Sequence, residues 1–119
     1  MKVIGITVPI FTQNFESTVK EYEILLGQST EHKFDIASMG LSVAKIGSIL
    51  VVCGSEDIID KLKQIRATLV VDSIDEYYSY LVDNKATILQ PPTSTPTGQN
   101  MIAKGKDGVT FEYVELKRD

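Results

Sequence analysis

The sequence predicts an α+β fold made of two β-α-β-β-β modules in tandem. The order of strand, amphipathic helix and three further strands occurs twice along the 119 residues. The two helix starts, Phe15-Glu16 and Ile74-Asp75, lie about half the chain length apart. Apolar residues alternate in the strand segments and recur at helical spacing in the helix segments, as the two kinds of element require.

The first module is expected over approximately residues 1–54. One parity carries Ile4, Ile6, Val8 and Ile10, which predicts a half-buried first strand. Asn14 is a candidate N-cap and Gly27 a stop for the helix that follows. The expected elements are a strand at 3–10, a helix at 15–26, and strands at 33–37, 41–46 and 48–53.

A linking helix is expected over approximately residues 55–65, and the second module over approximately residues 66–119. Ser73 with Glu76 three residues later is a capping-box pattern, so a helix should begin at Ile74. The expected elements are a strand at 66–72, a helix from 74, and strands at 85–90, 99–104 and 109–116.

Composition excludes several classes of function. The net charge of -4 and the lack of a Lys/Arg cluster argue against nucleic-acid binding. No apolar run approaches the roughly 20 residues that span a bilayer, so no membrane partner is expected. The single cysteine, Cys53, excludes an intrachain disulfide. The chain is expected to be cytoplasmic.

Motifs in both halves resemble those of one superfamily. Val71-Asp72-Ser73-Ile74, Pro91-Pro92, Lys106-Asp107-Gly108 and the strand after them resemble the C-terminal module of the glyoxalase/bleomycin-resistance/dioxygenase superfamily, also called the vicinal oxygen chelate (VOC) superfamily. Phe15-Glu16 and Leu26-Gly27 resemble its first helix and helix exit. The resemblance implies one domain over residues 1–119, with a curled, cup-shaped mixed sheet, helices on the convex side and a ligand in the concave side.

The resemblance also carries expectations about metal and assembly. Metal-dependent relatives commonly place a histidine on the first strand of each module and a carboxylate or Gln on the last. The corresponding positions here are Thr7, the apolar segment 48–53, Arg66 and Glu112, so only Glu112 could be a ligand. His32 lies where relatives supply no ligand. No metal and no other cofactor is therefore expected, and a homodimer is implied.

Face parity selects the candidate ligand-binding residues. The smaller, more polar faces of the first, fifth and last strands suit a cleft, and the candidates on them are Thr7, Arg66, Thr68, Thr110 and Glu112. We expect Arg66 to pair with Glu112 in place of a metal and to grip an anionic or carbonyl-bearing ligand. The alternative is an exposed Arg66 and a solvated Glu112. The segment 91–98, bordering the cleft in relatives, is expected as a lid or as a plain connecting loop.

Three functions remain open at this point. The first is a metal-independent small-molecule-binding protein, similar to the antibiotic-sequestering members of the superfamily, and it is the function favoured here. The second is a lyase, isomerase or dioxygenase, with Glu112 as general base and Arg66 as oxyanion stabiliser if any residue is catalytic. The third is a non-catalytic dimeric interaction module.

Overall fold

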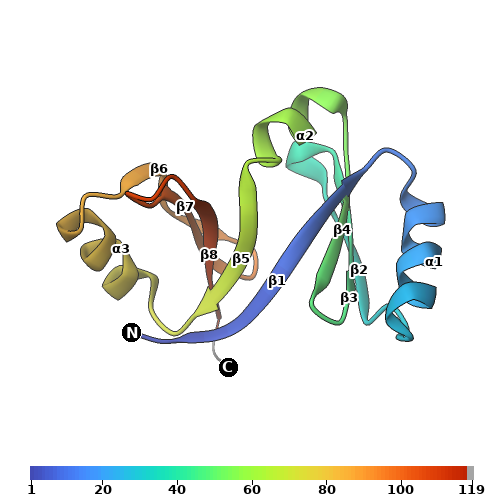
Figure 1. Ribbon diagram of the computed structural model, residues 1–119, viewed down its shortest axis with the longest axis horizontal. Helices are drawn as coiled ribbons and strands as arrows, with labels where there is room; N and C mark the ends of the chain where they lie inside the picture. The colour runs from blue at the N-terminus through green and yellow to red at the C-terminus, as the bar shows by residue number, and fades with distance from the viewer. Residues whose placement is uncertain (118–119) are drawn as a thin grey trace. The chain divides into compact units, whose positions relative to one another are not determined.

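The computed structural model describes residues 1–117 and shows the predicted order of elements twice (Figure 1). The elements are β1 (Val3–Thr12), α1 (Phe15–Leu26), β2 (His32–Ile36), the 3₁₀ helix η1 (Ala37–Met39), β3 (Leu41–Ile46), β4 (Ile49–Cys53), α2 (Glu56–Leu62), β5 (Ile65–Val71), α3 (Ile74–Asp83), β6 (Thr87–Thr95), β7 (Gly98–Lys104) and β8 (Thr110–Leu116). The strand order is β2-β3-β4-β1-β5-β8-β7-β6, and the sheet is mixed because β1/β4 and β5/β8 are parallel. The α+β class and the doubled module are confirmed.

The chain forms two compact units, and strand β1 contributes to both. We call Thr7–Gln64 the first unit, and Met1–Ile6 with the chain from Ile65 onward the second unit. In the first unit, α1 packs on β3 and β4, burying Val19, Ala44, Ile46 and Val51. Ile58 and Leu62 of α2 pack on a smaller cluster of Leu41, Val43 and Val52. Each of these faces follows from the apolar periodicity of its helix or strand.

In the second unit, α3 covers one face of the strands. Its Ile74 and Leu81 pack with Val71, Met101, Ala103 and Tyr113 in one buried cluster. Because side chains alternate along a strand, the residues next to these on β5, β7 and β8 point to the opposite face. That opposite face carries Thr68, Asn100 and Glu112, and it is where the candidate site lies.

Strand β1 has the predicted alternation but not the predicted burial. Ile4 and Ile6 are 61% and 54% exposed, whereas Thr7 on the other parity is buried. The prediction of a half-buried apolar face was therefore wrong at Ile4 and Ile6, whereas Ile10 on the same face is half-buried. Alternation reveals that a strand has two unlike faces, but which face is covered depends on where the helices pack, and the cores of α1 and α3 form over other strands.

The proline-rich segment also differs from the prediction of a loop at 91–98. Strand β6 continues through Pro91 and Pro92 to Thr95, and only Pro96 and Thr97 separate it from β7. Proline cannot donate a backbone hydrogen bond, so it is tolerated in a strand at a sheet edge or at a bulge. Strand β6 meets both conditions: it pairs only with β7, and its register shifts around Gln90 and again before Thr93.

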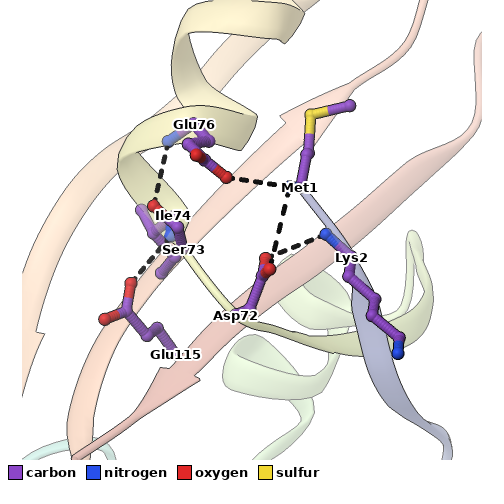
Figure 2. Close-up of polar contacts among 7 residues, drawn as sticks. All are labelled: Met1, Lys2, Asp72, Ser73, Ile74, Glu76 and Glu115. Atoms are coloured by element: carbon purple, nitrogen blue, oxygen red, sulfur yellow. Dashed lines mark hydrogen bonds and ion pairs between the residues drawn. The ribbon is translucent and has the colours of Figure 1, made fainter.

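The N-terminus of α3 is held by contacts from three directions (Figure 2). The Ser73 hydroxyl accepts from the Glu76 amide at 3.3 Å, and Glu115 Oε1 of β8 accepts from the Ile74 amide at 2.8 Å. The Glu76 carboxylate pairs with the Met1 amino group at 2.9 Å instead of returning to Ser73. The predicted N-cap is confirmed, since two of the backbone donors that a helix start leaves free are satisfied.

Removing the Ser73 cap tests the contribution of this helix end. Ser73→Ala is expected to lower the free energy of unfolding by about 1 kcal/mol, because an amide at the helix start loses its acceptor. Ser73→Asp, which restores a capping oxygen, should remain within about 0.5 kcal/mol of the original protein in urea denaturation. Equal losses for the two variants would contradict the capping role.

Candidate functional site

A chain of polar side chains ends at Glu112 on the face of the second unit opposite α3. Thr68 Oγ1 donates to Glu112 Oε1 at 2.8 Å. Asn100 Nδ2 donates to Glu112 Oε2 at 3.3 Å, and Gln90 Nε2 donates to Asn100 Oδ1 at 2.8 Å. We call Gln90, Asn100, Thr68 and Glu112 the Glu112 network. It draws on four neighbouring strands, β5, β8, β7 and β6.

Strand register explains why these four side chains meet. Thr68 stands directly opposite Glu112 in the parallel β5/β8 pair. Asn100 stands opposite Val114 in the antiparallel β7/β8 pair, so it reaches Glu112 across the diagonal. Diagonal neighbours on one face are within reach of long side chains. The bulges in β6 place Gln90 where its amide can reach Asn100.

The direction of these hydrogen bonds follows from the carboxylate. An ionised carboxylate only accepts, so Asn100 must turn its NH2 toward Glu112. The Asn100 carbonyl oxygen is then free to accept from Gln90. All three donors are neutral, and each Glu112 oxygen keeps a lone pair for a further donor. The network therefore orients a half-buried negative charge without neutralising it.

Arg66 does not take part in this network. Its side chain is exposed, and no ion pair joins it to Glu112 within the described residues 1–117. A bulge in β5 sets Ile65 opposite Thr110 and Ala67 opposite Phe111, leaving no partner position for Arg66. The predicted Arg66–Glu112 pair was wrong because counting along the strand assumes regular alternation, which the bulge interrupts. Thr68 occupies the position opposite the carboxylate.

The other predicted site residues lie in different surroundings. Thr110 is buried at the start of β8 and shares its parity with Glu112. Thr7 is also buried, but it belongs to the first unit. Ligand binding by Thr7, Arg66, Thr68, Thr110 and Glu112 stays a prediction. Sequence reasoning missed Asn100 and Gln90, because Ile102 and Ile88 share their parity in the two predicted strands and no polar alternation marks them.

The metal-binding residues that the superfamily implies do not come together around Glu112. Within residues 1–117, no three His, Cys, Asp or Glu side chains lie close enough to hold an ion. The partners of Glu112 are a threonine hydroxyl and an asparagine NH2, and an NH2 donor cannot ligate a cation. The residues present do not fit a divalent metal, which usually takes three or more protein ligands.

Tyr77 and Tyr113 pack together under α3, whereas Tyr78 and Tyr80 on the same helix are exposed. Burial raises the pKa of Tyr113, and burial also raises the pKa of Tyr77. The two rings lie 5.7 Å apart between their centroids, and Tyr113 belongs to the cluster under α3. Their phenols therefore remain protonated at neutral pH.

Comparison with solved structures identifies the fold of the chain. A hypothetical protein from Methanosarcina mazei, itself uncharacterised, is 33% identical over 100% of this chain and 97% of its own, with a TM-score of 0.91. Methylmalonyl-CoA epimerase from Mycobacterium tuberculosis matches 98% of this chain and 90% of its own, with a TM-score of 0.79 at 18% identity. The chain has the fold of the vicinal oxygen chelate superfamily.

Other VOC structures agree with this assignment. Methylmalonyl-CoA epimerase from Streptomyces coelicolor, in complex with 2-nitronate-propionyl-CoA, covers 98% of this chain and 100% of its own, with a TM-score of 0.78 at 16% identity. At 16–18% identity, the epimerases share the VOC fold, and that likeness says nothing of substrate. No family model and no curated protein matches the sequence. The fold that the resemblance implied is confirmed.

Proposed function

We propose that this VOC protein binds a small molecule at the Glu112 network and does so without a metal. One observation carries the proposal: Thr68 and Asn100 hold a half-buried carboxylate in a fixed direction and leave its outer lone pairs free, while Gln90 orients Asn100. A small number of oriented polar groups is typical of a small-molecule site. The network occupies the face that the VOC fold leaves uncovered by α3.

The enzyme alternative receives less support from the same geometry. A general base at Glu112 would require a nearby cation or donor to stabilise the charge that develops on the substrate. Arg66, the residue predicted for that role, is exposed and has no ion pair with Glu112. Binding without chemistry requires only the contacts that the network already provides.

A thermal-shift screen of metabolites and antibiotics tests the proposal. A ligand of the network should raise the melting temperature of the original protein and of Glu21→Gln, an exposed control, but not of Glu112→Ala. At a ligand concentration of 100 times Kd the gain is about 2.7 kcal/mol. Elemental analysis of protein purified without chelators should find no stoichiometric Mn, Fe, Ni or Zn. A stoichiometric metal, or ligands indifferent to Glu112→Ala, would contradict the proposal.

We also propose that two copies associate through strand β1. Strand β1 lies between β4 and β5 in the sheet, and the contact that we propose uses its side-chain face. Ile4 and Ile6 project from that face, and more than half of each side chain is exposed. Two such strands related by a two-fold axis would cover each other's isoleucines, which is the self-complementary contact of a symmetric dimer.

The mass in solution tests this association. The 13.2 kDa chain should elute with twice that mass in size-exclusion chromatography with light scattering. The double variant Ile4→Glu/Ile6→Glu should be monomeric at the same concentration, because it would bring charges together on an apolar contact. Ile24→Glu is the control, since Ile24 of α1 is 82% exposed and lies outside β1. A monomeric original protein, or a dimeric double variant, would contradict the proposal.

A further inference from the structure

We infer that the Glu112 network selects ligands that carry a protonated amine and disfavours ligands that carry a carboxylate or phosphate. This inference rests on the proposed function, because it concerns the ligand bound at the same face. The juxtaposition that carries it is a half-buried carboxylate surrounded by neutral donors, beside a short apolar strip on the same strands.

The charge of the network points to a cationic group. The hydroxyl of Thr68 and the amides of Asn100 and Gln90 carry no net charge, so the network as a whole carries the charge of Glu112 alone. No Lys, Arg or His among residues 1–117 forms an ion pair with this carboxylate. A ligand cation would supply the missing counter-charge, whereas a ligand anion would add a like charge.

The hydrogen bonds point to a donor. Every bond within the network runs toward Glu112: Gln90 donates to Asn100, and Asn100 and Thr68 donate to the carboxylate. The ionised carboxylate can accept further hydrogen bonds on its outer lone pairs and has no hydrogen to donate. An ammonium group has three donors and no acceptor, so it suits this site in both charge and hydrogen bonding.

The residues beside Glu112 can receive the apolar part of such a ligand. Val70 and Val114 stand opposite each other in the β5/β8 pair, two residues beyond Thr68 and Glu112, and both are half-buried. Gly5 of β1 adds no side chain here, and a methyl group built on it would touch only Val70. An amine bound to Glu112 can therefore lay its hydrocarbon body along Val70 and Val114.

The competing arrangement is an anion held by Arg66. Arg66 lies two residues before Thr68 on β5 and its side chain is exposed, so a carboxylate ligand could reach it from solvent. In that case the ligand would approach Glu112 with a like charge. The two arrangements predict opposite orders of affinity for an amine and an acid of the same size.

Three matched probes distinguish the arrangements: benzylamine, benzyl alcohol and benzoate, followed by ¹⁵N–¹H NMR titration. Benzylamine should shift the amides of Val70 and Val114 and the side-chain NH2 of Asn100 saturably, with at least roughly tenfold higher affinity than the other two probes. Glu112→Gln should lower the affinity for benzylamine at least about tenfold. Glu21→Gln changes the net charge equally at an exposed position, so it should leave the affinity unchanged.

Glu112→Gln is a suitable variant because the network can reverse. The new side-chain NH2 can donate to Asn100 if Asn100 and Gln90 both flip, so every bond keeps a donor and an acceptor. If the variant does not fold, the salt dependence of benzylamine binding to the original protein tests the same inference. Raising the NaCl concentration about tenfold, from about 0.05 to about 0.5 M, should weaken the binding of benzylamine and leave the binding of benzyl alcohol unaffected.

Each outcome decides the inference. Tighter binding of benzoate, or benzylamine binding that neither Glu112→Gln nor salt weakens, would overturn it and leave the proposed function standing, because a ligand would still occupy this face. No shift with any of the three probes would overturn it too. The proposed function would then be judged by the wider thermal-shift screen, which does not depend on amines.

Discussion

Gly98→Ala is expected to lower the free energy of unfolding by at least about 3 kcal/mol, the combined cost of backbone strain and overpacking. Gly98 is the first residue of β7 and has a φ of 153°, a value that residues other than glycine rarely adopt. A methyl group there would also collide with the backbone carbonyl oxygen of Glu115 on the neighbouring strand β8. Strand backbone cannot move aside as a flexible side chain can, so both costs remain in the folded state.

A second glycine separates the two costs. Gly108 also has a positive φ, 88°, but no atom lies within 4 Å of a methyl group built on it. Gly108→Ala should therefore lose only the strain, about 1–2 kcal/mol. Urea denaturation of both variants measures the difference. Equal losses of unfolding free energy would show that the close approach of Gly98 to β8 adds no steric cost to the alanine variant.

The same substitution should disturb the Glu112 network. Gly98 lies two residues before Asn100 and stands opposite Leu116 in the β7/β8 pair, so a displacement of this end of β7 changes the distance between Asn100 and Glu112. The side-chain NH2 signals of Asn100 in the NMR spectrum are expected to move in Gly98→Ala and to stay in place in Gly108→Ala.

Met101→Ala is expected to destabilise the protein by about 2–5 kcal/mol, the range for removing a large apolar side chain from a core. Met101 is 0% exposed and lies in the cluster under α3 with Ile74 and Leu81. Its removal leaves a cavity that strand and helix can fill only in part. The midpoint of urea denaturation should fall while its slope stays constant, because the surface exposed on unfolding changes little.

Met39 provides the matched control for this core substitution. It is the same residue type, but it is 39% exposed and ends the 3₁₀ helix η1. Met39→Ala should change the free energy of unfolding by no more than about 0.5 kcal/mol. If Met39→Ala cost as much as Met101→Ala, burial under α3 could not be the cause of the larger loss.

Local signals in the sequence were sufficient to predict most of the elements. Ser73 accepts from the Glu76 amide at the start of α3, as the capping pattern predicted, and Gly27 ends α1 in the left-handed conformation. Both signals act within one helical turn. Alternation in β8 places Phe111 and Tyr113 on one face, and both pack in the cluster under α3. Motifs along the chain also predicted the fold, which the matching solved structures share.

The wrong predictions concern features that depend on a partner strand or a neighbouring helix. Proline in β6 is compatible with a strand because that strand lies at the edge of the sheet. The apolar face of β1 is exposed because the helix cores form over other strands. Arg66 misses Glu112 because of a bulge in β5. None of these conditions is encoded within the segment itself.

The sequence by itself determined the α+β class, the doubled module and the presence of a lone carboxylate at position 112, because each follows from residue type and spacing along the chain. Only the tertiary structure decided what surrounds that carboxylate. Thr68, Asn100 and Gln90 reach it through the register of four strands. A register shift of one residue would turn every side chain of a strand to the other face, so spacing alone could not assign these partners.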